Sequence, residues 1–463
     1  MKLSRFVVGA ALICAVPFAF AQQPTALRAP VPPAANSDPK LTFERYSLPN
    51  GIEVILVPDK SVPLVSVSVW YHVGSGYEVY GKSGFAHLFE HMVFQGSKHV
   101  GDDRHFEVLK KIGSEQVNGT TNSDRTNYFE VVPSNQLEAA LWLESDRMGY
   151  LLEKLSETSL KNQIDVVRNE RRQRYDNVPY GKARFALNAA LYPEGHPYRY
   201  MTIGKHEDLE AASIDDVKNF FKTWYVPANS TIALTGDFEM PVAKKLVQKW
   251  FGSFPKSEKP KVVPVPAPTK LQEREVTVDD EFAKQRQIVF AWHSPANYAD
   301  GDAELDIAAN ALMREGPGRL YKALVYDRPL ATNVSAFQGG AQFSGVFQVT
   351  VTLRPEAKVD DVKKLVAAEI ARLGKEPLSE KEIQRVIAGN ESGVIRQLEN
   401  LLARGEILQA YNHYLGDPGK LSWDLDRFRN TNAEKVRGVV ATYLLPDRMV
   451  TIITNPVTKG GAK

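Results

Sequence analysis

The sequence is poor in cysteine, has almost no net charge and carries no long apolar run after its first 21 residues. The single cysteine, Cys14, lies inside that apolar start, so the rest of the chain forms no disulfide. Lysine and arginine number 57 against 55 aspartates and glutamates, and without Lys2 and Arg5 the two signs balance at 55 each. Such a balance gives no indication of a polyelectrolyte partner such as nucleic acid.

Residues 1–21 have the composition of a secretory signal peptide. Lys2 and Arg5 give a positive start, an apolar core follows, and Ala19-Phe20-Ala21 fits the small-residue cleavage rule. The core is shorter than the ~20 residues of a membrane span. The residue before Cys14 is isoleucine, whereas a lipoprotein cleavage site needs a small residue there. We therefore expect export to a periplasm or to the exterior, and an uncleaved anchor is the alternative.

Proline-rich stretches divide the remaining chain into two segments. Residues 22–40 are rich in proline and alanine and predict a disordered tail, and residues 255–275 predict an extended linker. We expect a first domain at 41–254 and a second at 276–458. Alternating strand and helix patterns predict an α+β fold for each domain, a mostly antiparallel sheet covered by helices.

The second segment repeats the pattern of the first. A strand pattern that contains Trp292 echoes the one that contains Trp70, 222 residues earlier. A helix predicted at 302–314 takes the place of one predicted at 83–96. We therefore expect two homologous domains joined by the proline-rich linker. Further helices are predicted at 135–150, 184–192, 214–224 and 241–251.

Residues 83–96 predict a short, buried helix with two histidines on one face. The serine at its start is a candidate N-cap, and the glycine at its end a candidate stop. His87 and His91 are four residues apart, so their imidazoles stand one turn above the other, and Glu90 shares this face. Buried imidazoles beside a carboxylate need a partner to offset their desolvation. The His-x-x-Glu-His spacing suits a zinc ion with a glutamate beside its water; two hydrogen-bonded core histidines are the alternative.

A catalytic zinc ion needs a third protein ligand. The segment 159–177 predicts a second helix, on which Glu170 continues an apolar stripe at three-residue steps. An acid in such a stripe is a candidate ligand. Spacing alone does not distinguish Glu170 from Asp165 or Glu157, and all three stay open on these grounds.

The segment 84–96, followed about eighty residues later by Val166-Val167-Arg168-Asn169-Glu170 and then Asp176-Asn177, resembles the pitrilysin/insulinase family of zinc peptidases. These enzymes carry the inverted His-x-x-Glu-His motif. The likeness covers nearly the whole chain after the signal segment and is closest to short, bacterial processing-peptidase-like members. It implies that the chain is a zinc metalloendopeptidase.

The resemblance also implies the site residues. One zinc ion per chain would be held by His87, His91 and Glu170, with Glu90 as the general base. The family often has a second acid seven residues before the glutamate ligand. That position is Gln163 here, and we expect it to support the ligands without binding the ion.

Residues 117–133 predict two short, polar strands joined at Ser123-Asp124. Polar strands can form an open sheet edge that pairs with an extended peptide, and a merely exposed hairpin is the alternative. The resemblance implies that the strand lines the cleft and binds the substrate backbone. Asn118, Gly119 and Thr120 are therefore the expected substrate-binding residues.

The second segment lacks the metal ligands, since Ile307, Asn310 and Ala311 stand where the motif residues would be. In the family, an arginine and a tyrosine of a catalytically silent domain face the zinc, and here Val325 and Thr332 take their positions. The resemblance thus implies the zinc-bearing subunit of a heterodimer, with a homologous subunit that supplies the pair; a homodimer is the alternative. The alternative function is a non-catalytic peptide-binding or structural subunit that keeps the zinc site.

Overall fold

The computed structural model describes residues 38–102, 104–262, 265 and 271–457. The predicted signal peptide at 1–21 lies outside these residues, as do most of the predicted tail at 22–40 and part of the predicted linker at 255–275. The described part of that linker has no helix or strand before Arg274, where a strand begins. The chain from Lys40 onward forms one compact unit.

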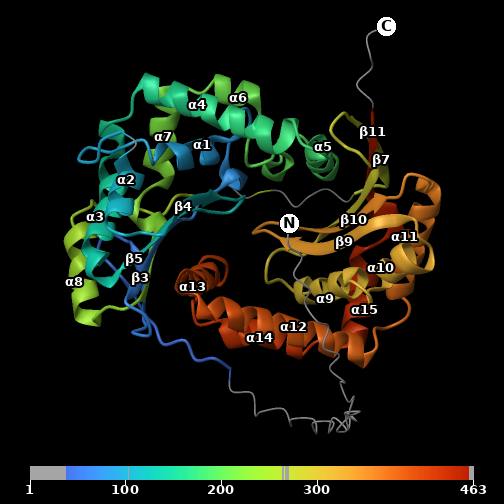
Figure 1. The fold of residues 1–463 in the computed structure, drawn as a ribbon. Helices are drawn as coiled ribbons and strands as arrows, with labels where there is room; N and C mark the ends of the chain where they lie inside the picture. Colours follow the sequence, from blue (N-terminus) through green and yellow to red (C-terminus); the bar gives the residue numbers. More distant parts are fainter. Residues whose placement is uncertain (1–37, 103, 263–264, 266–270, 458–463) are drawn as a thin grey trace, which may run out of the picture. The chain divides into compact units, whose positions relative to one another are not determined.

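The first half of the chain builds a six-stranded sheet with the order β1-β2-β6-β3-β5-β4. Figure 1 labels β3, β4 and β5 of this sheet. β2 and β6 run parallel, and the other neighbouring pairs are antiparallel. β4 is an edge strand, so its outer side carries backbone groups without a strand partner in the described residues. The strands span Glu44–Ser47 (β1), Glu53–Pro58 (β2), Leu64–Tyr71 (β3), Gln116–Thr121 (β4), Thr126–Pro133 (β5) and Ser230–Gly236 (β6).

The second half builds a five-stranded sheet with the order β7-β11-β8-β10-β9. Its parallel pair is β7 and β11, and its other pairs are antiparallel. Apart from β1, the two sheets share one strand order and one position of the parallel pair. The predicted α+β class with two homologous, mostly antiparallel halves is therefore confirmed. The strands span Arg274–Asp280 (β7), Gln287–Ser294 (β8), Ala331–Gly340 (β9), Gly345–Leu353 (β10) and Val450–Pro456 (β11).

Helices cover the sheets and bury their apolar side chains. In β3, Val65, Val67 and Val69 point to the same side and pack in one core with Leu88 and Phe89 of α1. A matching core in the second half surrounds α9. The helices span Phe85–Met92 (α1), Arg104–Lys111 (α2), Leu137–Tyr150 (α3), Glu157–Arg171 (α4), Gly181–Leu191 (α5), His206–Glu210 (α6), Ile214–Trp224 (α7), Met240–Phe251 (α8), Asp302–Met313 (α9), Arg319–Tyr321 (α10), Val359–Leu373 (α11), Glu380–Glu399 (α12), Leu401–Leu415 (α13), Leu421–Arg429 (α14) and Ala433–Tyr443 (α15).

The two halves exchange one helix each. α13, from the second half, packs on β3 and β6 of the first sheet, where Leu408 joins Ile55, Val57 and Ala233. α5, from the first half, packs on β7 and β11 of the second sheet (Figure 1). The predicted domain limits at 41–254 and 276–458 stay predictions, because these two helices join the segments across them.

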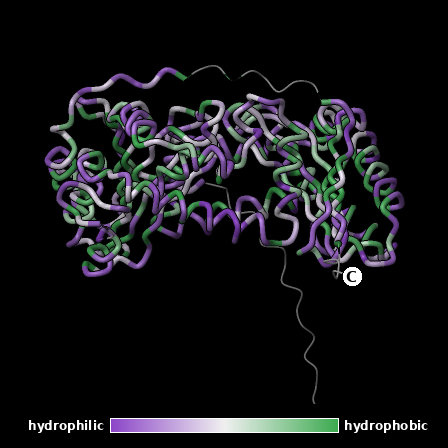
Figure 2. Tube along the Cα trace, turned by 90° about the horizontal axis from the view of Figure 1, so that it is seen from above, coloured by the Kyte–Doolittle hydropathy of each residue, from purple (hydrophilic) through white to green (hydrophobic). Residues whose placement is uncertain are grey.

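Hydrophobic residues gather inside both halves, whereas hydrophilic residues predominate on the outer helices (Figure 2). Among the helices that the structure describes, none is both long enough and apolar enough to cross a membrane.

Candidate metal centre

The candidate centre is built on α1, whose start is held by a half-buried carboxylate, that of Glu78. Glu78 accepts hydrogen bonds from the backbone N–H groups of Gly84 (2.9 Å) and Ala86 (2.7 Å), and burial raises its pKa to about 8. Gly84 lies at φ +89°, and a Cβ there would stand 2.8 Å from the Cα of Gly204. The predicted serine N-cap is wrong, because Ser83 instead donates its hydroxyl to Asp208 (2.5 Å).

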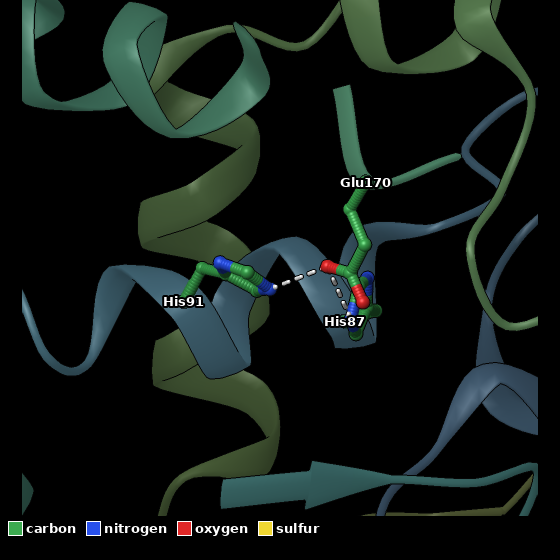
Figure 3. Close-up of side chains that lie close together, drawn as sticks. All are labelled: His87, His91 and Glu170. Carbon is green, nitrogen blue, oxygen red and sulfur yellow. Dashed lines mark ion pairs between the residues drawn. The ribbon is translucent and has the colours of Figure 1, made fainter. Parts of the chain in front are cut away.

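The structure brings His87, His91 and Glu170 together (Figure 3). Glu170 comes from α4, and its Oε2 lies 3.2 Å from His91 Nε2 and 3.6 Å from His87 Nε2. The three donor atoms lie within 4.8 Å of one another. The alternatives that spacing left open are not in this group: Asp165 is 60% exposed and faces Arg168.

This donor set fits a zinc ion. Ligand atoms bound tetrahedrally at about 2.0–2.1 Å lie roughly 3.3 Å apart, close to the separations between Glu170 and the two imidazoles. Two neutral imidazoles and one carboxylate are the ligands that a catalytic zinc site with an open fourth position uses. The ligand roles of His87, His91 and Glu170 stay predictions.

The surroundings of the set favour a neutral His87 and an ionised Glu170. Burial, followed by the neighbouring His91, lowers the pKa of His87 to about 4. The hydrogen bond with His91 lowers the pKa of Glu170, although burial opposes it. Arg174, in the π-helical turn after α4, also pairs with Glu170 at 2.7 Å.

Glu90 reaches the same cavity from α1. Its Oε2 accepts a hydrogen bond from the Thr121 hydroxyl at 2.5 Å. Burial raises the pKa of Glu90, and this hydrogen bond works against the rise. The carboxylate therefore stands beside the metal ligands with one oxygen engaged by the protein.

A cavity of about 490 Å³ joins all the predicted site residues. Gln163 of α4 is 8% exposed and lines it, as do the three predicted substrate-binding residues of β4. Because side chains alternate along a strand, Gly119 faces α1, while the Asn118 and Thr120 side chains lie on the opposite face of the sheet. Asn118 and Thr120 nevertheless line this cavity, because they lie on the edge strand of the sheet.

Sequence reasoning missed several residues of the site. Thr121 carries no spacing signal, because it reaches Glu90 through the tertiary fold. Arg174 did carry one, since it lies four residues after Glu170, the spacing of an ion pair along a helix. Phe94 and Phe106 stack at 4.7 Å between ring centroids and form an aromatic wall, with Phe106 46% exposed. The signal for Phe94 was present, since it lies three residues after His91 in the motif segment.

The matching helix of the second half has no such site. α9 also begins after a glycine in the left-handed conformation, Gly301. Counted from that glycine, Glu304, Ile307 and Ala308 occupy the places of the motif residues, so the histidine pair is absent in this register as well. Val325 is half-buried in a π-helical turn and Thr332 is exposed on β9.

Comparisons with known proteins identify related chains for both halves. The family model "Insulinase (Peptidase family M16)" matches residues 53–196, and the model "Peptidase M16 inactive domain" matches residues 211–390. The zinc protease PqqE of Helicobacter pylori is 29% identical over 364 residues, which are 77% of this chain and 80% of the relative. The uncharacterized zinc protease YmxG of Bacillus subtilis is 22% identical over 412 residues, 89% of this chain and 98% of the relative.

Solved structures show the same fold. A protease from Helicobacter pylori superposes with a TM-score of 0.84 at 25% identity, over 90% of this chain and 100% of its own. The periplasmic protease PqqL from Escherichia coli gives a TM-score of 0.76 at 16% identity, over 90% of this chain and 48% of its own. A peptidase M16 inactive domain from Pseudomonas fluorescens gives 0.76 at 19% identity, over 91% of this chain and all of its own.

Proposed function

We propose, from the premise that this chain belongs to the pitrilysin/insulinase family of peptidases, that it is a zinc-dependent endopeptidase acting on peptides or unfolded segments. The observation that carries the proposal is the meeting of His87, His91 and Glu170 from two separate helices. Glu90 lies in the same cavity, and a purely structural ion would need no such base.

His87, His91 and Glu170 would hold the zinc ion, one per chain. When bound, zinc supplies Lewis acidity that brings the pKa of a water towards 7 and polarises the scissile carbonyl. Glu90 takes the proton of the attacking water and passes it to the leaving amine. Gln163 lines the cavity beside Glu170 without a charge of its own, which suits a residue that supports the ligands.

The substrate would lie extended along β4. This strand is at the sheet edge beside the cavity, so a peptide can add to it through backbone hydrogen bonds. Asn118, Gly119 and Thr120 form the middle of that edge. Backbone pairing gives affinity with little side-chain selectivity, which suits peptides and unfolded segments inside an enclosed cleft.

The proposal includes a partner and a location. The zinc-bearing chain would pair with a homologous subunit that supplies the arginine and tyrosine whose places Val325 and Thr332 hold here, with a homodimer as the alternative. Export to a periplasm or to the exterior is supported by the composition of residues 1–21.

The absence of the arginine and tyrosine from this chain favours a second candidate function, that of a non-catalytic peptide-binding or structural subunit. A subunit with Val325 and Thr332 could retain zinc and bind peptides without cleaving them. One structural neighbour is described as an inactive domain, although it shares only 19% identity and so supports the fold alone.

The test is the chain from residue 22 onward, alone and co-purified with a homologous subunit encoded beside it. Zinc content is measured together with cleavage of an unstructured fluorogenic peptide, with and without a chelator. We expect one zinc per chain and chelator-sensitive cleavage, and loss of at least ~10³-fold in kcat for Glu90→Gln with zinc retained. Zinc without cleavage in either preparation would favour the peptide-binding subunit. Full activity of the chain alone would contradict the proposed heterodimer.

A further inference from the structure

We propose that the β4–β5 hairpin is the positioning element of Glu90, with Thr121 holding its carboxylate and Asp124 fixing the hairpin to the second half of the chain. The inference rests on the proposed function, because it assigns a positioning residue to the base of that reaction. Thr121 and Asp124 follow Asn118–Thr120 in the chain, but neither is among the predicted substrate-binding residues.

Two residues on the same face of β4, Gly119 and Thr121, lie against the Glu90 side chain. Thr121 donates its hydroxyl to Glu90 Oε2 at 2.5 Å. Two residues earlier, a Cβ on Gly119 would stand 3.0 Å from Glu90 Cγ and 3.1 Å from both Phe94 and Tyr128. The strand therefore touches the stem of Glu90 at Gly119 and its carboxylate at Thr121, and little space is left for another side-chain conformation.

The donor direction of Thr121 is set by its neighbour on β5. Thr126 gives its own hydroxyl proton to the backbone oxygen of Val73 at 2.9 Å. Its oxygen lies 3.4 Å from the Thr121 hydroxyl, a much longer approach than the one to Glu90. The Thr121 proton is thus directed at Glu90 Oε2, which leaves the other carboxylate oxygen to face a water and receive its proton.

The hairpin turn is anchored by a buried carboxylate. Asp124 is 2% exposed and accepts the hydroxyl of Tyr198 at 2.8 Å on one oxygen. On the other oxygen it accepts the hydroxyl of Tyr414 at 2.8 Å and the backbone N–H of Gln342 at 3.0 Å. Tyr414 belongs to α13 and Gln342 to the loop between β9 and β10, so two of the three donors come from the second half.

The turn between the anchor and the strand is itself closed by hydrogen bonds. The side-chain oxygen of Asn122 accepts the backbone N–H groups of Asp124 (2.8 Å) and Arg125 (2.9 Å). Only two residues separate Asp124 from Thr121 in the sequence. A displacement of α13 or of the β9–β10 loop therefore reaches the Thr121 hydroxyl through a short, hydrogen-bonded segment, so the metal-free half can set the geometry of the base.

The decisive comparison is Thr121→Val against Thr121→Ser, in the zinc-loaded preparation that shows wild-type cleavage. Valine keeps the shape and removes the donor, so we expect kcat to fall roughly 10–100-fold with KM changed by less than about threefold. Serine restores the donor and should return kcat to within about threefold of the wild type. Zinc content and melting temperature should not change. Thr442→Val, an exposed threonine of α15 that bonds to Gly438, is the matched control and should behave as the wild type.

A second readout does not depend on turnover. Crystal structures of the zinc-loaded wild type and of Thr121→Val should show the Glu90 carboxylate fixed in the first and displaced or disordered in the second. An unchanged Glu90 together with an unchanged kcat overturns the role of Thr121. A wild-type chain that binds zinc but cleaves no peptide, alone or with its homologue, contradicts the proposed function instead. The crystal comparison then still tests whether Thr121 positions the Glu90 carboxylate.

Asp124→Asn and Tyr414→Phe test the anchor. Each removes part of the Asp124 network without touching the cavity, so we expect kcat to fall roughly three- to tenfold, with the Glu90 carboxylate displaced less than in Thr121→Val. Combining Tyr414→Phe with Thr121→Val should add little to the loss, because both act through the same hydrogen bond to Glu90. Fully additive losses would show that the anchor acts on something other than Thr121.

Discussion

Two pairs of histidines meet in this protein, and their surroundings differ. His87 and His91 stand on one helix with ring centroids 4.8 Å apart, and together with Glu170 they line a cavity of about 490 Å³. His72, after β3, and His413, on α13, stack at 4.9 Å with their Nδ1 atoms 2.7 Å apart. Among the described residues, no carboxylate joins His72 and His413 in a candidate set of metal ligands. Two imidazoles in contact are therefore not enough to suggest a metal site.

Burial and nearby positive charges keep His72 and His413 neutral. Burial, followed by the charge of Lys259, lowers the pKa of His72 to about 3. Burial also lowers the pKa of His413 well below its usual value, helped by His72 and by the cations of Arg125 and Lys259. His72 completes its hydrogen bonding through Thr231 at 2.9 Å. The pair is a neutral contact between α13 and the first sheet, whereas the first pair is arranged for a cation.

The largest predicted effect separates the candidate third ligands. Glu170→Ala should raise the Kd for zinc on the order of 10²–10³-fold, because one of three protein ligands is lost. Asp165→Ala and Glu157→Ala, on the same helix, should leave zinc affinity within about threefold of the wild type, and so should His413→Asn. Zinc titration with a competing chelator checks all four. Equal losses for Asp165→Ala and Glu170→Ala would contradict the assignment of the ligand.

The next effect is a loss of stability at acidic pH that comes from His72 and His413. Below pH 6.5 the unfolded chain protonates a histidine that the folded chain keeps neutral, so stability falls as the pH drops towards the lowered pKa. Each such histidine lowers the free energy of unfolding by about 1.4 kcal/mol per pH unit below 6.5, which is about 2 kcal/mol at pH 5. His413→Asn should therefore reduce the loss of stability between pH 7.5 and 5 by about 2 kcal/mol. Urea denaturation at both pH values measures it, and an unchanged loss would mean that His413 is protonated in the folded chain.

The smallest effect compares α1, which carries His87 and His91, with α13, which carries His413. α1 is capped from a distance by Glu78, and α13 by its own N-cap Asn400, which accepts the N–H of Ala403 at 2.9 Å. Glu78→Ala and Asn400→Ala should each cost about 1 kcal/mol of stability, the usual value of a helix cap. Only Glu78→Ala should also weaken zinc binding, by roughly tenfold, since it loosens the helix that holds His87 and His91. Similar zinc affinities in the two variants would show that the cap does not orient the ligands.

Much of the fold followed from local patterns. The alternation in β3 and the repeat at Trp292 predicted strands that the structure contains, and the helices predicted near 214–224 and 241–251 lie where expected. The exchange of α5 and α13 did not follow, because an amphipathic helix shows which of its faces is buried and not which sheet covers it. The cap of α1 was missed for a related reason: Glu78 lies six residues before Gly84, outside the usual capping pattern.

The sequence alone determined the local half of the candidate site. Helical geometry places His87, Glu90 and His91 on one face whatever surrounds them, because 3.6 residues per turn bring positions three and four apart together. The family resemblance already favoured Glu170 over Asp165 and Glu157, but only the tertiary structure brought its carboxylate to these imidazoles and Thr121 to Glu90. The tertiary structure also joined His72 to His413, 341 residues away in the chain. The physical reason is that such meetings depend on how whole helices and sheets pack, and a periodic pattern within one element carries no information about its neighbour.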